Sequence, residues 1–281
     1  MEDILNRIAG RSKQMIPAEN GDYINQDDNG LLYCGKCHTR KQGMVHMPFG
    51  ELRPHILCKC QQIKADRERA EQQAREFAEA VQRNKTLCYP KAEQEKMLRK
   101  NFDNAEDSKL MRIARNYVEN FPRLLKEGKG LTLFGGTGAG KSYAAACICN
   151  ALLGKGYRCM FTNFARIRNE LSGMWEERQD YIDGLSQYSL LVLDDLGAES
   201  DSSFMSEIVH AIIDARLRAG LPTIVTTNLT ALQLSSGQDI SRSRIYSRLF
   251  EMTIPIEVKH SDRRRDNMAE ESKKYASLLG M

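Results

Sequence analysis

The segment Leu131-Thr-Leu-Phe-Gly-Gly-Thr-Gly-Ala-Gly-Lys-Ser142 combines a short apolar strand, a glycine-rich loop and the start of a helix. It fits the pattern G-x-x-x-x-G-K-[ST], in which loop amides surround phosphates, the lysine reaches the β- and γ-phosphates and the hydroxyl binds Mg²⁺. The following helix adds its positive dipole end. The segment therefore predicts a triphosphate site. The expected binding residues are Gly135, Gly136, Thr137, Gly138, Ala139, Gly140, Lys141 and Ser142.

Apolar strand segments alternate with helical segments on the C-terminal side of this loop. Besides the strand before the loop, the pattern predicts strands at 158–162, 189–195, 222–228 and 252–258, and Pro255 suggests that the last is an edge strand. Helical patterns cover 143–153, 164–183 and 207–219. Such alternation indicates an α/β fold, a doubly wound parallel sheet of about five strands with ligands at the strands' carboxyl ends.

Two predicted strands end in polar side chains. Asp194 and Asp195 follow the apolar run Leu190–Leu193, and Asn228 closes the next strand. We expect Asp194 to hold Mg²⁺ opposite Ser142, and Asp195 to orient or activate the attacking water. Asn228 would hold the same water or the γ-phosphate. The alternatives are a helix cap for the two aspartates and a loop cap for the asparagine.

Arginines follow in two groups, Arg242, Arg244 and Arg248 in a predicted helix and then Arg263, Arg264 and Arg265. One of the first group is a candidate arginine finger that reaches the nucleotide of a neighbouring subunit and neutralises charge developing on its γ-phosphate. For the second group, a solvated or nucleic-acid-facing patch and a nucleotide-sensing role are equally compatible with the pattern.

Four cysteines lie in one short segment near the N-terminus. Cys34 and Cys37 are two residues apart, and Cys58 and Cys60 complete a set of four thiols, the ligand type and number of a structural Zn²⁺ site. The segment has few apolar residues, so metal would supply its folding free energy. Free surface thiols are the alternative. If one of the second pair is spare, the fourth ligand could be His38, His46 or His55.

A run rich in Glu, Gln, Arg, Lys and Ala over 61–85 predicts a long helix with a thin apolar face. A second helix over 107–120 carries apolar residues at helical spacing and should pack on the nucleotide-binding core. We therefore expect a zinc-binding domain at 1–60, a helical linker at 61–100, the ATPase domain at 101–267 and a tail at 268–281.

The composition excludes several protein classes. With 41 Lys and Arg against 37 Asp and Glu, the 281-residue chain has a net charge of +4, so nucleic-acid contact is allowed but not demanded. No apolar run approaches the roughly 20 residues of a membrane span, and acidic Glu2 and Asp3 disfavour a signal peptide. We expect a soluble, cytoplasmic protein.

Several of these motifs resemble those of the AAA+ ATPases, and within them the DnaC/DnaI-type replicative helicase loaders and the related IstB transposition helpers. The resemblance extends over about 100–267 and rests on the segments Leu133–Ser142, Leu191–Gly197, Thr226–Asn228, Arg244–Leu249 and Ser261–Arg263. It implies that 135–142 are Walker A, that Asp194 and Asp195 are Walker B, that Asn228 is sensor 1, that Arg248 is the arginine finger and that Arg263 is sensor 2.

The resemblance also implies a function, an ATP-dependent loader of bacterial or phage replication. Such a protein binds a DnaB-like helicase, self-associates through its ATP sites and delivers the helicase to single-stranded DNA. The resemblance also implies that the zinc-binding N-terminal domain at 1–60 is the partner-interaction domain, where the helicase is bound. Asp195 stands where many AAA+ proteins have Glu, so turnover is expected to be slow. The alternatives are an IstB-like transposition helper that engages duplex DNA and a transposase, and an adaptor that binds ATP without turnover.

Overall fold

The computed structural model describes residues 21–48, 50–105, 107–171, 177–197, 203–235, 240–259 and 276. Arg263, Arg264 and Arg265 lie outside the described residues, as does the predicted tail apart from residue 276. Contacts divide the chain into two compact units, Met1–Phe77 and Ala78–Met281. This division falls inside a helix, and the predicted limits at 60, 100 and 267 stay predictions.

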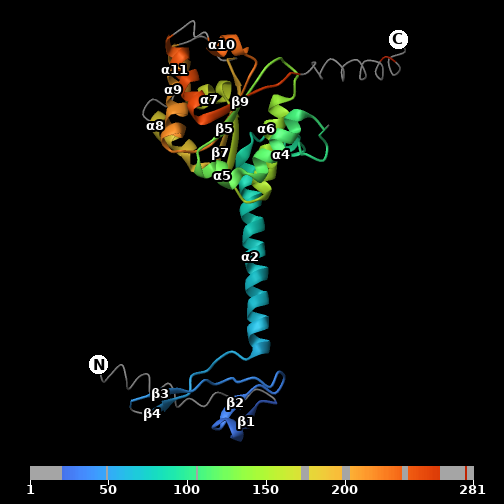
Figure 1. The fold of residues 1–281 in the computed structure, drawn as a ribbon, viewed down its shortest axis with the longest axis vertical. Coiled ribbons are helices and arrows are strands. Elements are labelled where there is room, and N and C mark those ends of the chain that lie inside the picture. Colours follow the sequence, from blue (N-terminus) through green and yellow to red (C-terminus); the bar gives the residue numbers. More distant parts are fainter. Residues whose placement is uncertain are drawn as a thin grey trace. The chain divides into compact units, whose positions relative to one another are not determined.

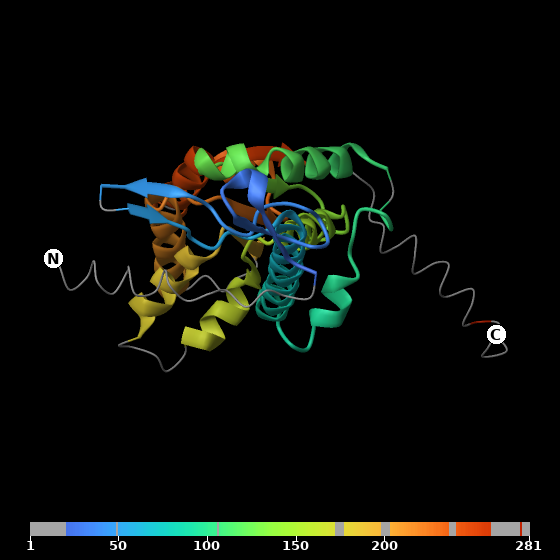
Figure 2. The same ribbon diagram turned by 90° about the horizontal axis from the view of Figure 1, so that it is seen from below.

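The first unit contains two small antiparallel ladders. β1 (Tyr23–Asn25) pairs with β2 (Leu31–Tyr33) across the short helix η1 (Gln26–Asp28), and β3 (Val45–Met47) pairs with β4 (Gly50–Leu52), a pair visible as two blue arrows in Figure 2. These three-residue strands are too short for a periodic pattern, and the sequence did not predict them. The unit contains a buried ion pair, in which Lys41 Nζ lies 2.6 Å from Asp22 Oδ2.

Helix α2 (Lys59–Cys88) extends the predicted 61–85 helix at both ends. Ion pairs four residues apart, Lys64 with Glu68 and Arg67 with Glu71, run along its surface, while Ile63 and Phe77 are more than half exposed. Such pairs support a solvated helix. Its last residue, Cys88, is buried with Tyr89 in the second unit's core.

The second unit is built on a five-stranded parallel sheet of order β6-β7-β8-β5-β9, which confirms the predicted fold class (Figure 1). Pro255 lies on β9, at the sheet edge, as predicted. The strands are β5 (Gly130–Phe134), β6 (Cys159–Asn163), β7 (Leu190–Leu196), β8 (Thr223–Thr227) and β9 (Thr253–Glu257).

Helices cover both faces of this sheet, with α4 and α6 on one side and α7, α9 and α11 on the other (Figure 1). Alternate residues of β7 enter the two cores, Leu190 and Val192 the first and Leu191 and Leu193 the second. A strand buried on both faces is the sign of a doubly wound fold. The helices are α3 (Gln94–Leu98), α4 (Lys109–Glu119), α5 (Phe121–Lys126), α6 (Lys141–Gly154), α7 (Phe164–Leu171), α8 (Arg178–Gly184), α9 (Ser203–Arg218), α10 (Ala231–Ser235) and α11 (Ile240–Met252), with a short η2 (Leu185–Gln187).

Two predicted helix limits differ from the structure. The helix predicted over 164–183 is described as α7 and α8, with 172–176 outside the described residues. The helix predicted from 207 begins at Ser203. Among the described helices, none combines the length and the apolar character that a membrane span needs.

Candidate functional site

The phosphate loop connects β5 to α6 at the carboxyl edge of the sheet. Gly135, Gly138 and Gly140 have φ of 133°, 75° and 89°, a region that favours glycine. At Gly135 a Cβ would also lie 2.5 Å from the carbonyl oxygen of Val258, so no other residue fits there without a backbone shift. The loop thus has the backbone that a helix N-terminus needs to enclose an anion.

Lys141, the first residue of α6, folds back over this loop. Its ammonium donates to the carbonyls of Gly135 and Gly136 and to Oδ1 of Asn228, each at 2.8 Å. Asn228 in turn donates from Nδ2 to Oδ1 of Asp195 at 3.0 Å. One chain of hydrogen bonds therefore joins the loop lysine, the end of β8 and the second aspartate of β7.

The first aspartate faces the start of α6. Asp194 Oδ1 accepts a hydrogen bond from Thr226 Oγ1 at 2.5 Å, and its carboxylate is also hydrogen-bonded to the Ser142 side chain. Burial raises the pKa of Asp194, while the hydrogen bonds from Thr226 and Ser142 oppose that rise. A serine hydroxyl beside a carboxylate is an oxygen pair of the kind that Mg²⁺ takes in phosphate sites.

The structure therefore brings Lys141, Ser142, Asp194, Asp195 and Asn228 into one group. Asp194 is mostly shielded, whereas Asp195 and Asn228 are exposed. The buried end suits a metal ligand, and the exposed end is open to water. The group can chemically bind a metal triphosphate and present a carboxylate to water.

Arg248 pairs with a different part of the second unit. It is on α11, and its guanidinium forms an ion pair with Asp214 of α9, a carboxylate that also pairs with Arg218 at 2.8 Å. Its side chain is 40% exposed. Arg242 and Arg244 share α11 with it, while Arg263 falls outside the described residues. Among the described residues, the candidate finger thus pairs with α9 and not with its own phosphate loop.

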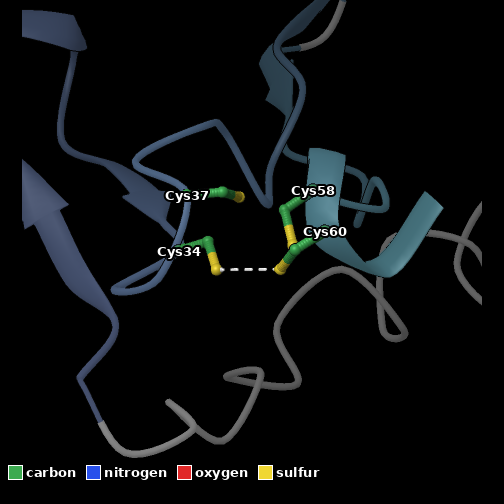
Figure 3. Close-up of side chains that lie close together, drawn as sticks. All are labelled: Cys34, Cys37, Cys58 and Cys60. Atoms are coloured by element: carbon green, nitrogen blue, oxygen red, sulfur yellow. Dashed lines mark hydrogen bonds between the residues drawn. The ribbon is translucent and has the colours of Figure 1, made fainter. Parts of the chain in front are cut away.

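The four cysteines of the first unit converge (Figure 3). Cys34 and Cys37 follow β2, Cys58 and Cys60 lie at the start of α2, and all four Sγ atoms lie within 4.8 Å of one another. The Sγ of Cys60 is 3.6 Å from that of Cys34 and 3.3 Å from that of Cys58. A tetrahedral Zn²⁺ with four thiolates separates its sulfurs by about 3.8 Å, so the thiols fit that ion.

Neighbouring groups favour the thiolate form of two of these cysteines. Backbone amides of Cys37 and Lys36 lower the pKa of Cys34, and the Thr39 hydroxyl with the Cys60 amide lowers the pKa of Cys37 to about 5. His38, His46 and His55 are exposed, and no described histidine belongs to the group. The set of four cysteines is therefore preferred to the histidine alternative.

Two features of these sites were missed in the sequence. Thr226 contacts both aspartates, and its position two residues before Asn228, on the same face of β8, could have indicated it. Asp22 accepts a hydrogen bond from the Gly35 amide, between the first two cysteines, and pairs with Lys41. No sequence pattern marks that pair.

The sequence matches the profile of a family described as IstB-like ATP binding protein over residues 62–269. It is 27% identical over 187 residues to the replicative helicase loader DnaI of Bacillus subtilis (strain 168), covering 61% of this chain and 60% of that protein. It is 33% identical over 121 residues to the replicative helicase loader DnaC of Escherichia coli (strain K12), covering 41% of this chain and 47% of that protein. The chain thus spans about half of these relatives' length.

The chain is also similar to solved structures of DnaI and DnaC. A crystal structure of DnaI matches with a TM-score of 0.52 and 29% identity, and the match covers 64% of this chain and 99% of that one. A crystal structure of the DnaC helicase loader matches with a TM-score of 0.52 and 26% identity, and the match covers 58% of this chain and 99% of that one. AMPPCP-bound DnaA of Aquifex aeolicus, at 18% identity and a TM-score of 0.50 over 63% and 56%, shares the fold. These likenesses confirm the resemblance to AAA+ proteins of the loader type. Since the family profile covers most of its length, the chain belongs to the family of IstB-like ATP binding proteins.

Proposed function

We propose that this protein is an ATPase that loads a DnaB-like replicative helicase onto single-stranded DNA, in a bacterial or phage system. The likeness to DnaI and DnaC, at 29% and 26% identity over nearly the whole of their solved chains, carries the proposal. The convergence of the phosphate loop with Asp194, Asp195 and Asn228 supports the ATPase part of it. The first unit, which carries the four cysteines, is the proposed partner-binding unit. We further propose that the protein acts in the cytoplasm.

Each residue of the nucleotide site has a proposed task. Loop amides and Lys141 bind the phosphates, and Ser142 with Asp194 hold Mg²⁺, which would neutralise charge on the β- and γ-oxygens. Asp195 accepts the proton of the attacking water, or orients it together with Asn228. The carboxylate of Asp is one methylene shorter than that of Glu, so we expect slow turnover.

Two arginines would complete the site. Arg248 would reach the nucleotide of a neighbouring subunit once subunits associate, and Arg263 would contact the nucleotide of its own chain. The exposure of Arg248 and its ion pair with Asp214 of α9 support action between subunits. Hydrolysis should then increase with protein concentration.

For the helicase, we propose a binding surface on the first unit. Apolar side chains of its strands are unusually exposed, Ile24 at 60%, Met47 at 44% and Val45 at 43%. Val45 and Met47 lie two residues apart on β3 and so share one face of the strand. A contiguous exposed apolar surface is typical of an interaction site. Zn²⁺ on the four cysteines would hold this unit folded.

The test is native mass spectrometry of the whole protein with the cognate helicase, ATP and zinc, which reports partner, stoichiometry and metal together. V45D/M47D should lose the helicase complex while keeping the metal. His46 is the matched control, because it is exposed on the same strand but on the opposite face. H46A should bind normally. A wild-type protein that forms no complex would refute the loader proposal.

A transposition helper is the second candidate. The chain is 34% identical over 94 residues to a putative insertion sequence ATP-binding protein of Sinorhizobium fredii (strain NBRC 101917 / NGR234), covering 33% of this chain and 32% of that protein. Titration with single-stranded and duplex DNA of equal length separates the two. Tighter duplex binding with a steep salt dependence would favour the transposition helper.

A further inference from the structure

The two aspartates at the end of β7 are adjacent in sequence, yet both join the same site. In a regular strand, neighbouring side chains point to opposite faces of the sheet. Here Asp194 contacts Ser142 of α6, and Asp195 contacts Asn228, whose amide oxygen accepts from Lys141. Some local departure from regular strand geometry must therefore turn the two carboxylates to one side.

That departure is a β-bulge opposite a single threonine. Leu193 pairs with Val225 and Leu196 pairs with Thr227, so two residues of β7, Asp194 and Asp195, face one residue of β8, Thr226. Asp195 has φ of 65°, the left-handed conformation that a bulged residue can take. The bulge is what redirects the second carboxylate.

Thr226 bonds to both halves of the bulge. Its Oγ1 donates to Asp194 Oδ1 at 2.5 Å and accepts from the backbone N–H of Asp195 at 3.0 Å. The side chain is 1% exposed, so water cannot easily replace either bond. A hydroxyl has one donor and two acceptor sites, which lets one group make both contacts at once.

We propose that Thr226 is a positioning residue, whose hydroxyl holds the bulge that directs Asp194 and Asp195 to one metal and one nucleotide. This rests on the proposed function, because it concerns the same ATP site. Valine in its place has a similar shape but leaves the Asp195 amide and the Asp194 carboxylate each without this partner. Serine preserves both bonds.

The experiment compares T226V, T226S and T227V with wild type in the whole protein. Thr227 is the matched control, since its equally buried hydroxyl donates to the Leu196 carbonyl and accepts from the Leu229 amide, and contacts neither aspartate. ATP affinity is measured with Mg²⁺ and with a chelator, and kcat at saturating ATP. For T226V we expect kcat and the Mg²⁺-dependent gain in affinity to fall about tenfold or more, because two buried hydrogen bonds are lost. Affinity without Mg²⁺ should stay within about twofold of wild type.

The conservative variant separates positioning from a structural role. T226S keeps the hydroxyl and should therefore retain both the wild-type kcat and the wild-type Mg²⁺-dependent gain in ATP affinity. T227V should also retain both.

Each outcome decides the proposal. T226V with wild-type Mg²⁺ dependence, in a chain that binds Mg·ATP, would refute the positioning role and leave the ATPase intact. A wild type that binds no Mg·ATP would refute both. If T226V does not fold, T226C against T226S makes the same comparison, because a thiol has nearly the size of the hydroxyl and is a weak donor and acceptor. Equal behaviour of those two would refute the role.

Discussion

The Lys141 ammonium meets three oxygens, two loop carbonyls and the Asn228 side chain. The residue is only 6% exposed. The same ammonium can donate charge-assisted hydrogen bonds to phosphate oxygens, and such bonds are about twice as strong as those to neutral oxygens.

We therefore predict that Lys141→Ala lowers affinity for Mg·ATP by about a hundredfold or more, since two charge-assisted bonds to phosphate would be lost. Isothermal titration calorimetry measures the change. Lys155→Ala is the control, because Lys155 follows the far end of α6 and donates to the Val118 carbonyl. Affinity unchanged in K141A would mean that the loop does not bind the triphosphate.

Asp194 should titrate at a higher pH than an ordinary aspartate. Burial raises its pKa, so protonation favours the folded state, and the stability this gives is lost as pH rises through the folded pKa. Asp194→Asn should thus melt at the same or a higher temperature than wild type at neutral pH. Its ATP affinity should no longer increase with Mg²⁺, a loss of about tenfold or more.

Isothermal titration calorimetry, with and without Mg²⁺ at several pH values, measures the Mg²⁺-dependent gain in ATP affinity of wild type and D194N. In wild type the Mg²⁺-dependent gain in ATP affinity should disappear on acidification, at a higher pH than for an exposed carboxyl. D194N has no carboxyl at this position to titrate. A wild-type Mg²⁺ response in D194N would remove Asp194 from the metal site.

At the scale of elements, α9 and α11 are joined by one carboxylate that serves two arginines. Asp214 pairs with Arg218 on its own helix and with Arg248 on α11. The two arginines offer a controlled comparison, since each loses a similar surface ion pair of about 0–1 kcal/mol when truncated. They differ in their proposed relation to a neighbouring nucleotide.

We predict that Arg248→Ala leaves ATP affinity of the single chain within about twofold and lowers the assembly-dependent ATPase rate about a hundredfold or more. Arg218→Ala should alter neither. The measurement is ATPase rate against protein concentration, beside nucleotide affinity at low concentration. Equal losses of affinity and rate in R248A would place Arg248 in its own chain's site.

In the first unit, Thr39 connects the two cysteine pairs. Its Oγ1 lies 3.1 Å from Cys37 Sγ and accepts from the Lys59 amide, between the second pair, at 2.9 Å. We predict that Thr39→Val weakens zinc affinity about tenfold, the usual cost of losing a group that orients ligands. Competition with a chromophoric chelator measures it, and Thr39→Ser should match wild type. Equal affinities of all three would refute the role.

Helices and strands with a clear apolar pattern in their own residues were predictable from the sequence. Features that depend on a neighbouring strand were not. The alanine-rich α6 and the apolar strands of the sheet show their nature in their own residues. The bulge at Asp195 arises only where β7 meets β8, so no pattern within β7 reveals it. The strands of the first unit are three residues long, too short to show a periodic pattern of their own.

At the scale of the whole molecule, the residues of the phosphate loop and the two aspartates were identifiable because their motif is local. That Asn228 would lie near the two aspartates followed from parallel strands ending at one edge, but its hydrogen bonds to Lys141 and Asp195 were not predicted. The partner of Arg248 was not predictable, since Asp214 lies on another helix in an ordinary charged stretch. Functional residues within one motif could therefore be predicted from the sequence, whereas side-chain pairs between different helices and strands became visible only in the structure.

Metal removal should separate the two proposed activities of the protein. The four cysteines lie in the first unit and the phosphate loop in the second, and each unit has its own buried interior. The first has few buried apolar side chains, so we expect loss of zinc to unfold it, as in small zinc modules whose metal contributes on the order of 10 kcal/mol. We predict that a zinc chelator, or C34S/C37S, abolishes helicase binding but changes Mg·ATP affinity less than about twofold. Circular dichroism, helicase pull-down and calorimetry on the same samples measure folding, helicase binding and Mg·ATP affinity. Added zinc should restore the chelated protein but not C34S/C37S.

Two outcomes would contradict this prediction. If ATP affinity falls together with helicase binding, the metal stabilises the ATPase core as well. If neither changes, the cysteines hold no structural metal.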